Sequence, residues 1–291
     1  MKESIRVVAR DGYMLSATWY VADNPDEKVV LINSATGVRQ RFYSDFASFL
    51  SKQGVNVYTF DYRGIGDSRP EDLAHLQSDM KDWAKDVDGM IAHITQVHPR
   101  SHLVILGHSV GGQLIGMANL ARHADAVIMI GAQTPFWKAY PGAWMKTKLL
   151  LFWYLAIPLF TKLFGYFPAA RFWSFEDLPP NVALQWARWA KSPNYIFDEL
   201  PGFRKAFAAL DQPALMISFA DDALAPFNAV LDLKQYYSSL KIDHRHYEPD
   251  DLAQREIGHF GFFKKKSTSA LWREIELWIQ QLFPSGRSKV A

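Results

Sequence analysis

A serine flanked by small residues lies near the middle of the chain, where residues 107–112 read Gly-His-Ser-Val-Gly-Gly. The apolar run 103–106 before it predicts a buried strand, and the segment after it has the spacing of a helix. A sharp strand-to-helix turn of this kind needs glycines beside the serine and exposes its hydroxyl, as in a nucleophile elbow. We therefore predict Ser109 as a nucleophile and the amide of Val110, at the helix N-terminus, as an oxyanion donor.

A serine nucleophile needs a histidine base downstream, and His259 is the strongest candidate. It lies between Gly258 and Gly261, in a predicted loop just before the last helix-like segment. His244 and His246 share one face of a predicted strand and could bind a metal, but no third ligand of matched spacing accompanies them. We expect His259 to act as the base, and we predict no metal site.

Two adjacent carboxylates, Asp221 and Asp222, follow the predicted strand 213–219. A carboxylate at the carboxyl end of a sheet strand lies at the same edge as the elbow, so one of them can orient His259. We favour Asp222 and keep Asp221 as the alternative. The resulting order of serine, acid and histidine is the one that a sheet with a nucleophile elbow requires.

Apolar strand-like runs alternate with helix-like segments along most of the chain. This alternation predicts an α/β fold with a mostly parallel, doubly wound sheet and helices on both faces, preceded by a hairpin at Asp11-Gly12. It is interrupted by a long insertion that holds six of the ten tryptophans. The predicted organisation is a first core part at 1–134, a helical cap at 135–205, a second core part at 206–283 and a flexible tail at 284–291.

Composition excludes several classes of protein. The chain has 291 residues and no cysteine, which removes disulfides, thiolate metal sites and cysteine nucleophiles. Its net charge of +2 gives no reason to expect nucleic acid as a partner. Neither a dinucleotide fingerprint nor a phosphate-binding loop is present, so we expect no cofactor. The first residues include no apolar stretch of a secretory signal, which favours a cytoplasmic protein.

The segment 149–167 is the most apolar part of the insertion. Its length approaches that of a membrane span, but Pro158, Lys162 and Gly165 interrupt it. We expect a buried or surface-lying amphipathic helix, with at most a weak contact to a membrane surface.

With these pieces in view, the sequence resembles the α/β-hydrolases, in the branch of serine aminopeptidase-like and monoglyceride-lipase-like proteins. The matching motifs are VVLINSATG, FDYRGIGDS, LGHSVGG, SFADDALAP and IGHFGFF. The resemblance places the acid four residues before a proline, which is Asp222 before Pro226. It also implies that Ala35 supplies the second oxyanion amide and that the turn 61–68 is chiefly structural. Because Asn33-Ser34 replaces the usual His-Gly, the neighbouring Thr36 remains an alternative for that amide.

Together these features predict a serine ester or acyl hydrolase of the esterase and lipase type, which acts through a Ser-His-Asp triad and an acyl-enzyme. The aromatic insertion favours a small apolar acyl or aromatic ester as substrate. An aminopeptidase would instead need carboxylates near the substrate ammonium, for which the insertion offers Glu176, Asp177, Asp198 and Glu199. An acyltransferase and a non-catalytic binding protein of the same fold also fit the sequence.

Overall fold

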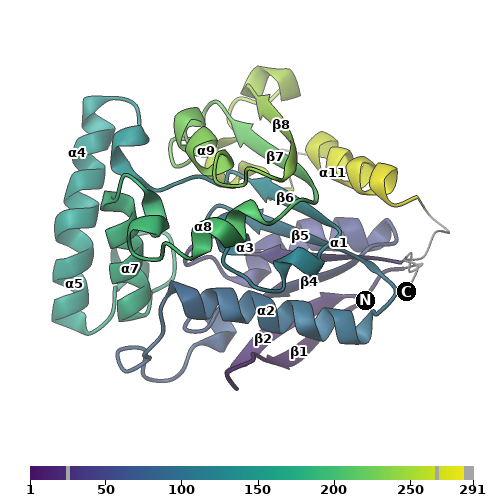
Figure 1. Cartoon of the computed structure of the whole chain (residues 1–291), viewed down its shortest axis with the longest axis horizontal. Coiled ribbons are helices and arrows are strands. Elements are labelled where there is room, and N and C mark those ends of the chain that lie inside the picture. The colour runs from purple at the N-terminus through teal and green to yellow at the C-terminus, as the bar shows by residue number, and fades with distance from the viewer. Residues whose placement is uncertain (24–26, 266–268, 285–291) are drawn as a thin grey trace.

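A computed structural model describes residues 1–23, 27–265 and 269–284. Its centre is an eight-stranded sheet in the order β1-β2-β4-β3-β5-β6-β7-β8 (Figure 1). The first two strands form an antiparallel hairpin and β2 pairs antiparallel with β4, while the pairs β4–β3, β3–β5, β5–β6, β6–β7 and β7–β8 are parallel. The strands are β1 (Lys2–Val8), β2 (Met14–Tyr20), β3 (Lys28–Asn33), β4 (Asn56–Phe60), β5 (His102–His108), β6 (Ala126–Ile130), β7 (Pro213–Phe219) and β8 (Lys241–Tyr247).

Successive side chains of the central strands point into two different hydrophobic cores. Val29 and Leu31 of β3 belong to the core under α2 (Met80–Val97), α3 (Val110–Ile115) and α9 (Phe227–Lys234). Val30 and Ile32 belong to the opposite core, which α1 (Ser44–Lys52) and α11 (Ser269–Leu282) cover. This period-two division explains why these strands are apolar throughout. The predicted doubly wound α/β sheet is confirmed.

The helix after the elbow is shorter than the sequence suggests. The spacing predicts a helix over 112–123, but α3 ends at Ile115. At Gly116 the ring of Phe207 lies only 2.5 Å from where a Cβ would be, and the Gly116 amide donates to the Tyr237 hydroxyl at 2.9 Å. Tertiary contacts to this backbone therefore end the helix where local spacing alone would extend it.

Between β6 and β7 the chain leaves the sheet and forms a separate helical layer, seen beside the sheet in Figure 1 and called the cap here. Its helices are α4 (Ala143–Leu151), α5 (Ile157–Phe164), α6 (Ala169–Phe172), α7 (Pro180–Lys191) and α8 (Phe203–Ala208), with a π-helical turn at Phe152–Ala156. The predicted limits 135–205 of this cap remain a prediction, and residues 285–291 of the predicted tail lie outside the described residues.

The stretch from Ala143 to Phe164 is one helix of 22 residues, called the cap helix here. It is long and apolar enough to cross a membrane by length and composition, and only 17% of its most apolar window is buried. Pro158 lies inside this continuous helix, two residues after the π-helical turn Phe152–Ala156, and has no amide hydrogen to donate within the helix. Of the two expected placements, the surface-lying one is observed.

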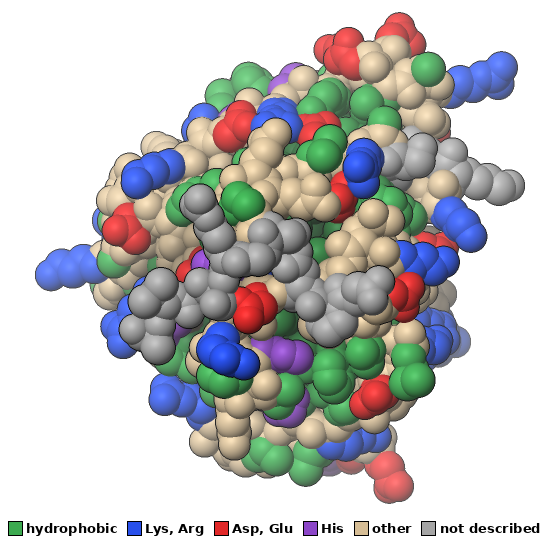
Figure 2. All heavy atoms as spheres, turned by 90° about the vertical axis from the view of Figure 1, so that its right-hand side faces the viewer, with side chains coloured by type: hydrophobic (Ala, Val, Ile, Leu, Met, Phe, Trp, Pro, Cys, Tyr) green, Lys and Arg blue, Asp and Glu red, His purple; other side chains and the backbone are tan. Residues whose placement is uncertain are grey.

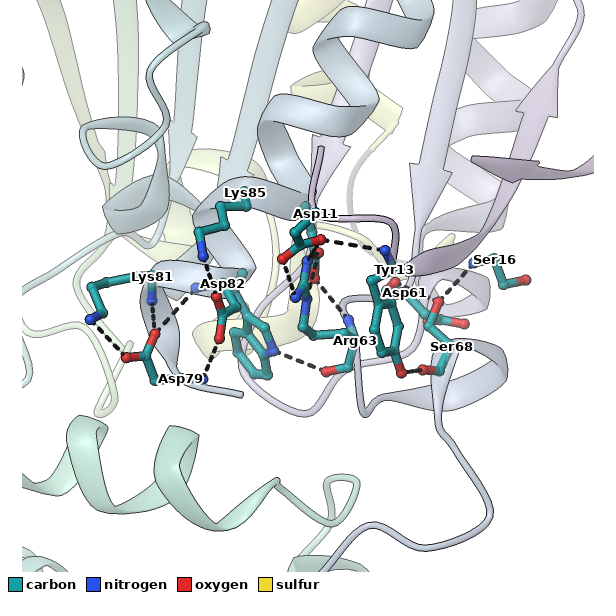
Figure 3. A network of polar contacts seen from close by, with 12 residues as sticks. Asp11, Tyr13, Ser16, Asp61, Arg63, Ser68, Asp79, Lys81, Asp82 and Lys85 are labelled. Atoms are coloured by element: carbon teal, nitrogen blue, oxygen red, sulfur yellow. Dashed lines mark hydrogen bonds and ion pairs between the residues drawn. The ribbon is translucent and has the colours of Figure 1, made fainter. Parts of the chain in front are cut away.

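The turn after β4 joins the first hairpin to α2 (Figure 3). Arg63 lies between Asp11 and Asp86, at 2.7 and 2.5 Å, and its carbonyl accepts from the Trp83 indole. The Ser68 hydroxyl donates to the Asp61 carbonyl at 2.8 Å. These contacts connect the turn to the first hairpin and to α2. They agree with the structural role that the resemblance implies for this turn.

The face of the molecule remote from the cap carries side chains of both charges, interspersed with apolar ones (Figure 2). On this face the described residues form no large patch of a single sign. The residues that could do chemistry gather instead at the opposite end of the sheet, under the cap.

Candidate active site

Ser109 lies at the tight turn between β5 and α3. Its backbone has φ 53° and ψ −119°, a region that a non-glycine residue adopts only at an energetic cost. Close packing enforces this turn, because a Cβ on Gly107 would lie 2.4 Å from the Gly112 nitrogen and one on Gly111 would lie 2.2 Å from the Asn33 oxygen. Ser109 therefore has the geometry of a nucleophile elbow.

Val110 is the first residue of α3, so its amide has no acceptor within that helix. The partial positive charge at a helix N-terminus favours an anion at this position. The amide of Val110 is thus available to an oxyanion formed at Ser109.

His259 and Asp222 form a buried pair. His259 Nδ1 lies 2.8 Å from Asp222 Oδ2, and the two side chains are 6% and 0% exposed. The other oxygen, Oδ1, accepts from the amides of Leu224 and Ala225, both at 2.9 Å. With Oδ1 occupied in this way, the carboxylate presents a fixed oxygen to the imidazole.

The neighbouring carboxylate, Asp221, has a different set of partners. Its Oδ2 accepts from the amides of Ile257 and Gly258, at 2.7 and 3.0 Å. It therefore holds the segment that leads into α10 (Gly258–Gly261), which carries His259. Of the two candidates for the acid, the structure brings Asp222 to the histidine.

Ser109 and His259 line the same cavity. They are 150 positions apart in the sequence, and the fold brings them to the same edge of the sheet. Among the contacts of the described residues, no hydrogen bond joins the Ser109 hydroxyl to the imidazole. Nucleophile and base commonly lie loosely in the absence of substrate and come together when it binds.

The amide predicted as the second oxyanion donor has a partner within the protein. The amide of Ala35 already donates to the Tyr43 hydroxyl at 2.8 Å, and this bond is buried. This contact competes with the predicted role of Ala35 as an oxyanion donor, because its hydrogen has another acceptor in this structure, and that role stays a prediction. The alternative residue, Thr36, lines the cavity together with Ser109.

A buried polar chain, which sequence reasoning missed, connects this loop to the elbow and to the histidine segment. The Tyr43 hydroxyl lies 2.9 Å from His108 Nδ1, and His108 Nε2 lies 2.9 Å from the His259 carbonyl. Because Tyr43 accepts from Ala35, its own hydrogen goes to Nδ1, and Nε2–H donates to the carbonyl. Burial and the nearby His259 hold the pKa of His108 well below its usual value, so this imidazole stays neutral.

The cavity above Ser109 has a volume of about 800 Å³ and a mostly apolar wall. The cap supplies most of that wall, including Leu149, Phe152, Leu159, Trp173, Phe175 and Trp186. Sequence reasoning assigned no substrate-binding residues, although the aromatic composition of the insertion carried the signal.

The four cap carboxylates considered for an ammonium group have other partners. Glu176 pairs with Arg39, Asp177 with Arg69, and Glu199 with Arg188. Asp198 accepts from Asn194 and Ser192. None of the four lines the cavity among the described residues.

The described residues contain no group of three or more His, Asp or Glu side chains that could hold a metal ion. His244 and His246 do converge, and both contact the buried Ser218 hydroxyl, at 2.9 and 2.8 Å. The pair thus has a protein partner at the edge of the sheet.

Solved structures share this architecture over almost the whole chain. A soluble variant of monoglyceride lipase from Saccharomyces cerevisiae, bound to a substrate analogue, superposes with a TM-score of 0.66 and 16% identity over 97% of this chain and 95% of that one. DcsB in complex with its substrate analogue gives a TM-score of 0.60 and 18% identity over 97% and 98%. At this level of identity the likeness establishes the fold, which is that of an α/β-hydrolase.

Sequence comparison matches parts of the chain to known proteins. The family model for serine aminopeptidase S33 matches residues 23–163. The uncharacterized protein YfhR of Salmonella typhimurium is 30% identical over 137 residues, 42% of this chain and 44% of that protein. Monoglyceride lipase of Rattus norvegicus is 23% identical over 146 residues, 50% and 46% of the two chains. Each alignment spans less than half of the relative's length.

The chain therefore has the α/β-hydrolase fold, and its matched part is similar to the serine aminopeptidase S33 family and to monoglyceride lipase.

Proposed function

We propose that this protein is a serine hydrolase of the esterase and lipase type. The observation that carries the proposal is the buried His259–Asp222 pair beside the strained Ser109 at one apolar cavity. A serine held at a tight turn, a carboxylate-oriented imidazole and an apolar cavity together fit the needs of acyl transfer.

In the proposed reaction Ser109 Oγ attacks the ester carbonyl while His259 takes its proton. The oxyanion accepts hydrogen bonds from the amides of Val110 and Thr36, each worth about 3 kcal/mol. Collapse of this intermediate breaks the ester bond, and His259 returns the proton to the departing alcohol. Water then attacks the acyl-enzyme by the same route and releases the acid.

The cavity supports an apolar acyl or aromatic ester as the substrate. Its wall is built from leucine, phenylalanine and tryptophan side chains, which favour an uncharged chain or ring. The peptidase alternative has less support, because the cap carboxylates are already paired and a substrate ammonium would be desolvated without a partner.

A fluorophosphonate probe tests the nucleophile directly. Wild type is expected to gain one adduct, on Ser109, and Ser109→Ala is expected to gain none and to lose hydrolysis of nitrophenyl esters. Aminoacyl nitroanilides assayed in parallel distinguish the peptidase reaction. An unlabelled wild type, or equal labelling of Ser109→Ala, contradicts the proposal.

We further propose that the cap helix makes a weak contact with a membrane surface. Leu151, Leu155, Leu159 and Leu163 recur every four residues along this helix and are 44–66% exposed, and the first three also line the cavity. An exposed apolar stripe with lysines nearby suits the interfacial region of a bilayer. Binding to lipid vesicles measures this contact.

A cytoplasmic location stays a prediction from the sequence.

A further inference from the structure

One segment of the cap, residues 174–179, rests directly on two loops of the core. Glu176 contacts the loop after β3, where Arg39 Nη2 donates to its Oε2 at 2.7 Å and Arg39 Nε lies 2.7 Å from its Oε1. The amide of Glu176 also donates to the Gly37 carbonyl at 2.8 Å. Glu176 thus holds this loop by both its side chain and its backbone.

Packing at Gly37 shows how closely the two segments fit. Gly37 has φ +64°, and a Cβ there would lie 2.7 Å from the Phe175 ring and 3.1 Å from the Glu176 carbonyl oxygen. The residue before it is Thr36, which lines the cavity with Phe175. The contacts of Glu176 therefore lie on the backbone directly beside the candidate oxyanion amide.

We propose that Glu176 is a positioning residue, which fixes the loop 36–39 through Arg39 so that the Thr36 amide faces the oxyanion. This inference rests on the proposed serine hydrolase function. In this proposal the cap covers the substrate and also positions one of the two amides that stabilise the oxyanion.

Asp177 provides a matched comparison. It also joins cap to core, through an ion pair with Arg69 at 2.9 Å, and its side chain is 13% exposed against 21% for Glu176. Arg69, however, follows β4 and does not line the cavity among the described residues. Removing either carboxylate loosens one contact between cap and core, and Asp177→Ala also removes the acceptor of the Ala170 amide within the cap. Only Glu176 is connected to the loop that carries Thr36.

The experiment compares Glu176→Ala, Asp177→Ala and Arg39→Ala with wild type, using a nitrophenyl ester too short to fill the cavity. We expect kcat to fall about tenfold or more in Glu176→Ala and Arg39→Ala, with KM little changed, because misplacing one donor weakens the transition state. The double variant of Glu176→Ala and Arg39→Ala is expected to lose no more kcat than either single variant, because both remove the same ion pair. The kcat of Asp177→Ala is expected to stay within about twofold of wild type. Equal losses in Glu176→Ala and Asp177→Ala overturn the proposal.

Hydrogen–deuterium exchange gives a readout that does not depend on turnover. Exchange of the segment 34–42 is expected to rise in Glu176→Ala and to stay at the wild-type level in Asp177→Ala. Unchanged exchange in Glu176→Ala overturns the positioning role even if the enzyme is active. A wild type that neither hydrolyses esters nor reacts with the fluorophosphonate probe overturns the proposed function itself, so the two failures are distinguishable.

Discussion

Asp221 and Asp222 are adjacent in the chain but contact different groups. Asp222 contacts the imidazole of His259 and is held by two amides of its own turn. Asp221 turns toward the segment before His259 and accepts two of its amides. One carboxylate orients the ring, and the other fixes the backbone on which the ring is mounted.

This division predicts unequal effects of two identical substitutions. Asp222→Asn is expected to lower kcat by about 10⁴, because an amide favours the wrong imidazole tautomer. Asp221→Asn keeps an acceptor for the two loop amides, so we expect a smaller loss of kcat and a drop of about 1–3 kcal/mol in the free energy of unfolding. Steady-state ester hydrolysis and urea denaturation measure the two quantities. A larger loss of kcat in Asp221→Asn than in Asp222→Asn would contradict the assignment.

The sequence predicts Ser109, His259 and the Asp221–Asp222 pair as candidates, because a motif, a chain order and a strand end locate them. It does not reveal that Tyr43 occupies the Ala35 amide, since this depends on one side chain from a separate segment. The loop after β3 could therefore be located from the sequence, while the amide that remains available within it required the structure.

At the scale of elements, the elbow depends on how closely α3 approaches the end of β3. Gly111, in the first turn of α3, leaves no room for a methyl group, because a Cβ there would lie 2.2 Å from the Asn33 oxygen and 2.9 Å from the Ser34 oxygen. Both obstacles are backbone atoms, so relief requires a shift of the helix or of the strand end.

We expect Gly111→Ala to lower the free energy of unfolding by about 1–3 kcal/mol through overpacking. It is also expected to reduce esterase activity, because the displaced strand end leads directly to Thr36. Gly202→Ala is the control, since nothing lies within 4 Å of its Cβ position, and it should leave stability within about 0.5 kcal/mol of wild type. Thermal or urea unfolding measures the stability of both variants. Equal free energies of unfolding for Gly111→Ala and Gly202→Ala would contradict the close packing proposed at Gly111.

The strands were predictable because each central one is an uninterrupted apolar run bounded by polar turns. The helix after the elbow was not, since its end at Ile115 depends on Phe207 and Tyr237, which are distant in sequence. Local periodicity indicates where an element begins, and contacts made only in the folded chain decide where it stops.

At the scale of the whole molecule, the cap joins the core on one side and faces solvent on the other. The sequence indicates an insertion and its aromatic character. It does not show that residues 143–164 form a single helix with most of its apolar window exposed, because an apolar run fits burial equally well.

This exposure predicts that the protein binds lipid vesicles through the cap. Trp144 and Leu163 are 72% and 66% exposed and lie outside the cavity wall, so Trp144→Glu and Leu163→Glu should weaken vesicle co-sedimentation several-fold without altering hydrolysis of a soluble ester. Leu277→Glu, on α11, is the control, with 41% exposure in wild type. Wild type that stays in the supernatant, or an equal effect of Leu277→Glu, contradicts the contact.

The row of groups from Ala35 through Tyr43 and His108 to His259 has a single direction, because each member gives its hydrogen to the next. The direction is fixed at both ends, because the Ala35 amide can only donate a hydrogen bond and the His259 carbonyl can only accept one. Three stretches of chain that meet at the nucleophile are consequently tied into one stiff unit. A substitution of Tyr43 or His108 is therefore expected to shift the backbone at Ala35 and at His259, although neither residue belongs to those two segments.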